Sequence, residues 1–141
     1  MLLKASNFSK RIGSLGRIDF MKGYYAYVGS AQSYLFPRLE RHFAKRKKHM
    51  HWHIDYLTSS RSISIKEAIY SSAVTKEFEC RLAKEIADLT FSLAIPSFGS
   101  SDCKHACRSH LFLLKSNESQ ATRSTIQIFR KLQLRPIRYH V

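Results

Sequence analysis

Apolar and polar residues alternate over several short stretches of this chain, and three longer stretches repeat an apolar residue every three or four positions. Alternation favours β-strands, whereas a spacing of three to four residues favours helices. The short stretches predict four strands, over residues 1–5, 24–28, 61–71 and 110–115. The longer stretches predict helices over residues 35–47, 75–89 and 124–134. Residues 51–57 fit a short helix and an extended segment equally well.

The helix predicted over residues 75–89 has the clearest pattern. An apolar stripe on one side faces away from polar positions on the other, the stripe being Phe78, Leu82, Ile86 and Leu89. The helix that begins near Leu35 contains Pro37, which is tolerated only in a first turn. Ser30 or Ser33 can cap the start of that helix.

Together these elements predict a mixed α/β (α+β) fold in which a small antiparallel sheet is flanked by helices. A chain of 141 residues suits one domain, and its 44% hydrophobic residues can form a core. A polar stretch begins at Asn117. We therefore divide the chain into a domain over residues 1–115 and a C-terminal tail over residues 116–141, which carries a helical pattern.

The charge balance indicates a polyanionic partner. Lys and Arg number 24 and Asp and Glu number 10, which gives a formal net charge of +14. Such an excess favours nucleic acid. A membrane surface is a weaker candidate, because the basic run of residues 42–48 is not attached to a long apolar stripe.

No segment approaches the roughly 20 apolar residues of a membrane span, and the first residues lack the apolar core of a signal peptide. Three cysteines, an odd number, favour a reducing compartment over a disulfide framework. We therefore expect a cytoplasmic protein.

Candidate chemistry is concentrated where the second predicted strand turns into the first predicted helix. Tyr25 and Tyr27 are two residues apart and share a strand face, and Arg38 and His42 are four apart and share a helix face. A phenol, a guanidinium and an imidazole that meet at one place can act on a phosphodiester.

The segment Tyr27-Val28-Gly29, followed by Arg38 and His42, resembles the GIY-YIG nuclease superfamily. The chain is also similar to the Uri-type branch of that superfamily, which is mostly archaeal. This similarity lies in five blocks within residues 11–114, namely residues 23–31, 51–57, 79–80, 98–103 and 109–112. The resemblance implies a central three-stranded sheet and phosphodiester cleavage in DNA.

The resemblance also implies roles for single residues. Glu79 matches a glutamate that holds one divalent cation, Mg²⁺ or Mn²⁺, with Glu77 as the alternative ligand. Arg38 would stabilise charge on the phosphate, Tyr27 would activate or position the attacking water, and His42 would assist proton transfer. Packing of the Tyr27 ring in the core and ion pairing of Glu79 on a helix surface are the structural alternatives.

One part of the superfamily pattern is missing. Its first strand carries Gly-x-Tyr, whereas this chain begins Met1-Leu2-Leu3-Lys4. Two main hypotheses follow: a divalent-metal-dependent DNA endonuclease, and a non-catalytic nucleic-acid-binding module that has lost the first catalytic tyrosine. A zinc-stabilised interaction domain is a third.

Seven residues are candidates for contacting DNA through charge, stacking or polar groups: Tyr25, Arg41, Arg46, Lys47, Lys48, Trp52 and His53. The spacing of His49, His51 and His53 would place three imidazoles on one face of a strand, where they could bind zinc, but would scatter them on a helix.

A second possible zinc site is Cys103-x3-Cys107-x2-His110, with His105 or Asp102 as the fourth ligand. Buried free thiols are the alternative interpretation of these cysteines.

Overall fold

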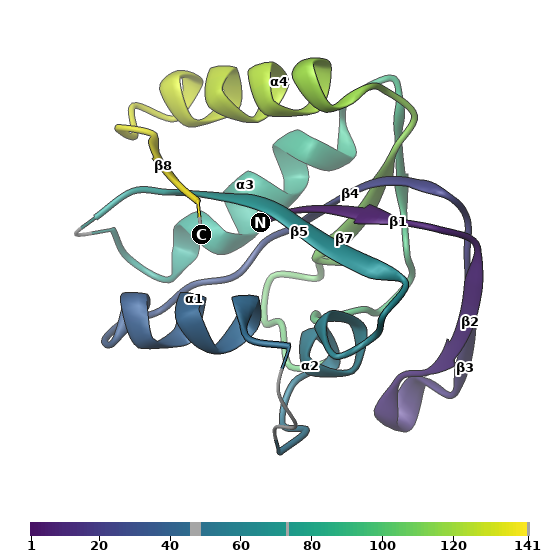
Figure 1. Ribbon diagram of the computed structural model, residues 1–141. Helices are drawn as coiled ribbons and strands as arrows, with labels where there is room; N and C mark the ends of the chain where they lie inside the picture. The colour runs from purple at the N-terminus through teal and green to yellow at the C-terminus, as the bar shows by residue number, and fades with distance from the viewer. Residues whose placement is uncertain (46–48, 73, 141) are drawn as a thin grey trace.

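Six strands form one antiparallel sheet in the computed structural model, which describes residues 1–45, 49–72 and 74–140 (Figure 1). The strand order is β6-β7-β4-β1-β5-β8. The strands are β1 (Leu2–Ala5), β4 (Gly23–Tyr27), β5 (Ile63–Tyr70), β6 (Ser92–Ala94), β7 (Leu111–Leu114) and β8 (Ile137–Tyr139). The mixed α/β class with an antiparallel sheet is confirmed, but the expectation of three strands is wrong.

Helices cover both faces of the sheet: α1 (Leu35–Phe43), α2 (His53–Thr58), α3 (Glu77–Ala87) and α4 (Glu118–Lys131). In Figure 1, α3 and α4 lie above the sheet and α1 and α2 below it. A separate hairpin, β2 (Phe8–Arg11) and β3 (Arg17–Phe20), extends beside α2, with a short 3-10 turn (Gly13–Leu15) at its tip.

The core has two parts, because the sheet is buried on both faces. Leu2 in β1 faces the cluster formed with α3 and α4, while its neighbour Leu3 faces the cluster formed with α2 and the hairpin. This alternation follows from the period of two along a strand. All four residues of β7 are buried, as expected of a strand covered on both sides.

The first helix begins where Pro37 requires and ends earlier than its pattern predicts. Pro37 lies in the first turn of α1, and the backbone becomes extended at Ala44. The predicted Ser30 or Ser33 cap is wrong, because Tyr34 occupies the N-cap position in a left-handed conformation with φ 57°. Residues 46–48 of the expected helix lie outside the described residues.

The ambiguous segment is helical: α2 begins at His53. His49 and His51 precede this helix, so His49, His51 and His53 do not line one strand face, and the zinc site proposed from that spacing is wrong. Asp55 in its first turn is fully buried and accepts hydrogen bonds from the backbone N–H groups of His51 and Trp52, both at 2.9 Å. Arg41 on α1 donates to both carboxylate oxygens, which ties α1 to α2.

Residues after 116 contribute to the same core. Helix α4 packs on α3 through Ala121, Ile128 and Phe129. Its Asn117 cap accepts a hydrogen bond from the Gln120 N–H at 2.8 Å. Strand β8 then pairs with β5. This strand has only three residues, which is too short for a hydrophobic pattern to predict it. None of the described helices is both long and apolar enough to cross a bilayer.

The buried Asp55 generates a stability prediction. Burial alone would raise the pKa of this carboxyl, but hydrogen bonds from Arg41 and two backbone N–H groups lower it below 3.8. A lowered pKa stabilises the fold above about pH 4, and that stability is lost as the pH falls toward the folded value. Asp55→Asn should lower the free energy of unfolding by about 3 kcal/mol at pH 7, because Arg41 loses its charged partner.

Urea unfolding at pH 7 and at pH 3 measures this effect. The difference in the free energy of unfolding between Asp55→Asn and the parent chain should be smaller at pH 3 than at pH 7. Asp88→Asn is the matched control, since Asp88 is exposed at the end of α3 and should change stability by less than about 0.5 kcal/mol. If the difference in the free energy of unfolding does not change with pH, the role assigned to the ionised carboxylate is contradicted.

Candidate functional site

A cavity of about 560 Å³ opens between α1, α3, the end of β4 and the loop around residues 99–105. Its lining includes four residues singled out from the sequence: Tyr27, Arg38, His42 and Glu79. Tyr27 is the last residue of β4, Arg38 and His42 lie on α1, and Glu79 lies in the first turn of α3. The structure therefore brings residues from three separate elements to one concave surface.

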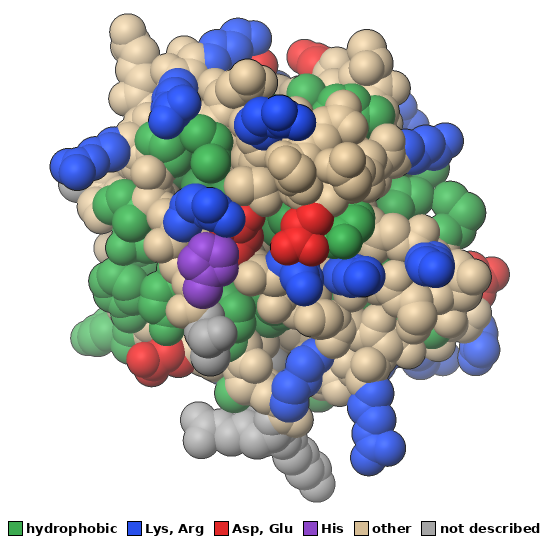
Figure 2. All heavy atoms as spheres, turned by 45° about the horizontal axis from the view of Figure 1, so that its top comes forward, with side chains coloured by type: hydrophobic (Ala, Val, Ile, Leu, Met, Phe, Trp, Pro, Cys, Tyr) green, Lys and Arg blue, Asp and Glu red, His purple; other side chains and the backbone are tan. Residues whose placement is uncertain are grey.

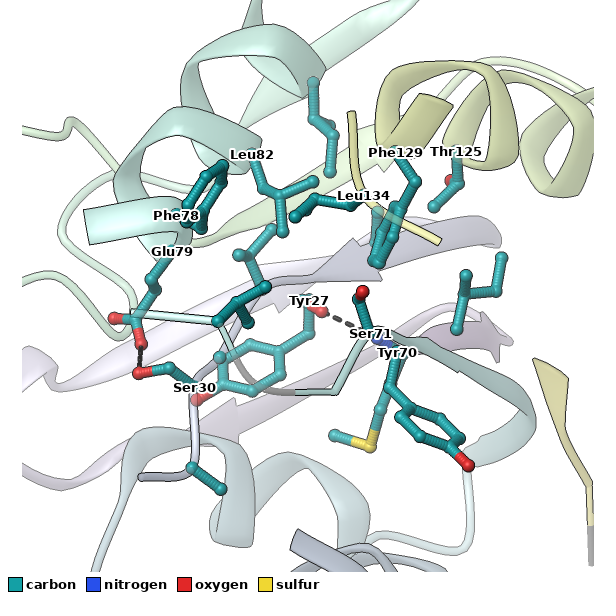
Figure 3. Close-up of a pocket in the computed structure, with 18 of the residues that line it drawn as sticks. Tyr27, Ser30, Tyr70, Ser71, Phe78, Glu79, Leu82, Thr125, Phe129 and Leu134 are labelled. Atoms are coloured by element: carbon teal, nitrogen blue, oxygen red, sulfur yellow. Dashed lines mark hydrogen bonds between the residues drawn. The ribbon is translucent and has the colours of Figure 1, made fainter. Parts of the chain in front are cut away.

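A smaller apolar cavity of about 120 Å³ adjoins the first and shares Tyr27, Ser30 and Glu79 with it. Figure 3 shows the Ser30 side chain pointing to the Glu79 carboxylate, beside the Tyr27 ring. Phe78, Leu82, Leu134 and Phe129 lie above these groups in the same view, with Phe78 next to Glu79. These apolar side chains come from α3, from α4 and from the segment that follows α4.

Gly29 and Gly99 lie close to the two edges of the Tyr27 ring. A β-carbon on Gly29 would lie 3.2 Å from Cε1 of the ring, and one on Gly99 would lie 3.3 Å from Cε2. Phe98 packs edge-on against the same ring at 6.4 Å between centroids. Burial, reinforced by the nearby carboxylates of Glu79, Asp55 and Asp102, raises the pKa of Tyr27 well above its ordinary value. Tyr27 therefore keeps its proton at neutral pH.

Arg38 and His42 form the α1 side of the cavity. The Arg38 guanidinium donates to the Ser30 carbonyl at 3.2 Å, and its central carbon lies 5.1 Å from the centre of the Trp52 ring. This stacking fixes the plane of the guanidinium. His42 Nδ1 lies 3.8 Å from Oδ1 of Asp55, and its ring faces Trp52 at 6.3 Å.

Glu79 has two hydrogen-bond donors. Ser30 Oγ donates to one carboxylate oxygen, and Nδ1 of His110 lies 3.2 Å from the other. Burial acts to raise the pKa of this carboxyl, but the hydrogen bonds from His110 and Ser30 lower it overall. Glu79 is therefore an ionised carboxylate at neutral pH, although its side chain is only 17% exposed.

A group of three cysteines and one histidine lies behind Glu79: Cys80, Cys103, Cys107 and His110. Their ligand atoms all lie within 4.8 Å of one another, and the three thiols are free. The Sγ atoms of Cys80 and Cys103 are 3.1 Å apart, and Nε2 of His110 is 3.9 Å from Cys80 Sγ. This Cys3His group can hold a metal ion.

The sequence pattern predicted three members of the Cys3His group and missed the fourth. Cys80 on α3 occupies the place expected for His105 or Asp102, which line the larger cavity instead. Cys80 follows Glu79 directly and is the one cysteine left over from the Cys103–Cys107 pair, so the cysteine count contained the signal. Burial opposes ionisation of Cys103, but hydrogen bonds from the Cys107 backbone and the Cys80 thiol lower its pKa to about 6.

The residues expected to contact DNA are only partly available. Tyr25 is 1% exposed, with its hydroxyl bonded to the Met21 carbonyl at 2.8 Å, so the expectation that it contacts DNA is wrong. Arg41 pairs with Asp55, and His53 Nδ1 accepts the Gly99 N–H at 2.9 Å. Trp52 is 37% exposed at the cavity. Arg46, Lys47 and Lys48 lie outside the described residues.

Comparison with known proteins gives a family. The family model described as "Domain of unknown function DUF123" matches residues 1–134, nearly the whole chain. Searches of curated proteins and of solved structures found no significant match.

The glycine contacts around Tyr27 generate a prediction. Gly29 has no left-handed φ, so Gly29→Ala adds a methyl group against the Tyr27 ring without straining the backbone. Overpacking of this kind costs about 1–3 kcal/mol and should move the ring. Gly13→Ala is the control for lost stability, because its φ of 45° makes an added methyl group costly to the backbone, while the new β-carbon would meet Tyr56 at 3.4 Å and not Tyr27. In NMR spectra, the Tyr27 ring resonances should shift in Gly29→Ala and stay in place in Gly13→Ala; unchanged resonances in both would contradict the contact.

Proposed function

The chain belongs to the DUF123 family, a domain of unknown function, and we propose from its own residues that it is a nucleic-acid-binding protein that hydrolyses a phosphodiester bond of DNA. The observation that carries this proposal is the cavity itself. Tyr27, Arg38, His42 and Glu79 come from three elements and line one surface large enough for a phosphate and its sugars.

The groups in the cavity are chemically suited to a phosphate. The planar guanidinium of Arg38, already oriented by Trp52, matches the oxygens of a phosphate and can stabilise the charge that develops on them. Because Tyr27 keeps its proton, it supports hydrolysis as a hydrogen-bond donor to water or to a phosphate oxygen, rather than as a free phenolate base. His42, beside Asp55, is the nearby imidazole for proton transfer.

Glu79 suits a divalent cation at the reacting phosphate. Each of its oxygens accepts one hydrogen bond in the fold, and a carboxylate oxygen has a second lone pair. Magnesium and manganese accept one protein carboxylate together with waters and phosphate oxygens. Such an ion would neutralise charge on the phosphate.

The Cys3His group suits zinc rather than magnesium. Thiolate and imidazole ligands favour zinc, whereas magnesium takes oxygen ligands. A tetrahedral zinc with Zn–S bonds of about 2.3 Å places its ligand atoms about 3.8 Å apart. The separation of 3.9 Å between Cys80 Sγ and His110 Nε2 is close to that value, whereas the 3.1 Å between the Sγ atoms of Cys80 and Cys103 is shorter, so these two thiols would move apart around an ion. We assign this zinc a structural role, since it would join α3 to the loop that precedes β7.

Zinc binding is directly measurable. The purified, reduced protein should contain about one zinc per chain, as a closed four-ligand site requires. Cys80→Ser should lose the zinc and lower the melting temperature, because a ligand is removed from α3. His105→Ala should retain it. Loss of zinc in His105→Ala, with retention in Cys80→Ser, would restore His105 as the fourth ligand and contradict the group described above.

The charge of the surface supports a polyanionic partner. Figure 2 shows Lys and Arg spread over the visible face, with few Asp or Glu side chains between them. On the hairpin, Arg11 and Arg17 are exposed and lie directly opposite each other across β2 and β3. Like charges at opposed positions destabilise a strand pair, and within the described residues neither arginine has an ion-pair partner. Phosphates of a nucleic acid would supply the missing negative charge.

Salt dependence tests the contribution of the hairpin. If both arginines neutralise phosphates, the double variant Arg11→Ser/Arg17→Ser should reduce the slope of log affinity against log salt by about 1.8 for duplex DNA. Arg123→Ser/Arg130→Ser removes the same charge from exposed positions on α4 and is the control. Equal slopes for the two double variants would contradict the hairpin contact, and absence of binding at low salt would contradict any nucleic-acid function.

Cleavage is tested with supercoiled, branched and single-stranded DNA, in the presence of Mg²⁺, Mn²⁺ or a chelator. Glu79→Gln should abolish cutting and leave DNA binding intact, because it removes charge without changing size. Arg38→Ala should slow cutting by on the order of a hundredfold, as loss of a charge-stabilising donor does. Glu85→Gln, also on α3 but paired with Lys131, should cut like the parent. Equal cleavage by Glu79→Gln and the parent would exclude this mechanism.

A non-catalytic nucleic-acid-binding module is the second candidate, and the state of Tyr27 favours it. Burial raises the pKa of Tyr27, which makes this phenol a poor base at neutral pH, and Tyr25 in the core cannot replace it. This candidate predicts DNA binding by the parent chain without cleavage in any of the conditions above.

A further inference from the structure

His110 belongs to the Cys3His group and also contacts Glu79 in the wall of the larger cavity, so its two ring nitrogens face different sites. Nε2 is on the side of the thiols, 3.9 Å from Cys80 Sγ. Nδ1 is on the side of the cavity, 3.2 Å from Glu79 Oε1. The other oxygen of Glu79 accepts the Ser30 hydroxyl. A continuous chain of contacts therefore runs from the thiols through His110 and Glu79 to Ser30 at the end of β4.

The surroundings leave the imidazole little freedom. His110 is 2% exposed, and a β-carbon on Gly99 would lie 3.4 Å from its own β-carbon. Its backbone is also fixed, since its N–H donates to the Phe98 carbonyl at 2.8 Å and its carbonyl accepts the Val28 N–H at 2.9 Å. The fixed backbone and the burial therefore favour the ring position that contacts both partners.

We propose that His110 is a positioning residue that joins the metal group to the reaction cavity. An ion bound at Nε2 occupies the lone pair of that nitrogen, so the ring proton must reside on Nδ1. That N–H then donates to Glu79 and holds its carboxylate toward the cavity. Zinc would thus act on the chemistry at Glu79 without touching the substrate, and this part of the inference rests on the proposed hydrolysis.

The coupling must operate in both directions, because a free-energy coupling between two sites is reciprocal. A carboxylate that accepts the Nδ1 proton makes Nε2 a better ligand, and loss of such a partner typically weakens metal binding or activity by about 10–100-fold. Glu79 therefore strengthens zinc binding, although it is not one of the four residues of the Cys3His group. This consequence can be measured without any DNA.

Two measurements test the chain of contacts independently of catalysis. In the zinc-loaded, ¹⁵N-labelled protein, NMR of the imidazole rings should show the His110 proton on Nδ1 and none on Nε2. In competition with a chelator, Glu79→Gln should bind zinc at least about tenfold more weakly than the parent. Glu85→Gln should match the parent. A proton on Nε2, or equal zinc affinity in Glu79→Gln and the parent, would overturn the proposal.

His110→Cys separates the two roles of the histidine. It keeps four zinc ligands but removes the donor to Glu79, so it should retain one zinc and bind DNA normally while cutting about 10–100-fold more slowly. His49→Cys, at an exposed position outside the group, controls for the added thiol. Zinc-loaded His110→Cys that cuts like the parent would contradict the positioning role. If the parent cuts no DNA, the proposed hydrolysis fails, and the ring spectra and zinc competition still decide whether the two sites are coupled.

Discussion

The site depends on keeping one carboxylate ionised inside the fold. Glu79 is mostly buried, and burial of an unpartnered charge costs several kcal/mol. Ser30 and His110 offset that cost by donating to its two oxygens. Ser30 lies just after β4 and His110 just before β7, so the contacts with Glu79 join the ends of two strands to the first turn of α3. The larger cavity lies at this junction, and α1 and the loop around residues 99–105 form its other sides.

Local periodicity predicted the parts of the site that lie close in the sequence. Tyr27 on its strand, and Arg38 with His42 on one helix, follow from spacings of two and four residues. Glu79 was identified through family resemblance, because nothing in the helical pattern distinguishes it from Glu77. Cys80 could not be placed, since its partners Cys103 and His110 are 23 and 30 residues away and only the tertiary fold joins them. Strands β6 and β8 were missed because three residues carry too little pattern.

Tyr25 and Tyr27 show what periodicity leaves undecided. Both lie on one face of β4 and belong to the same core cluster. Tyr25 is in the middle of the strand, where its hydroxyl finds a carbonyl inside the core, whereas Tyr27 is the last residue and reaches the cavity. Burial still acts on Tyr27 strongly enough to keep its proton in place. The position of a residue along the strand, rather than its face, therefore separates a structural phenol from one available to a substrate.

The buried acidic residues also shape the outer surface. Asp55 and Glu67 are inside the fold with arginine partners, Arg41 and Arg138, so two of the ten acidic side chains contribute no carboxylate to the exterior. Their arginine partners remain partly exposed, at 29% and 51% of their side-chain areas. The exterior is thus depleted of negative charge relative to the composition of the chain. In the function that we propose, attraction to a polyanion would arise from this distribution over the whole molecule, whereas chemistry at Glu79 would require one contact with His110. Affinity for nucleic acid would therefore persist when the cavity is inactivated, because the two proposed properties have separate physical origins within one fold.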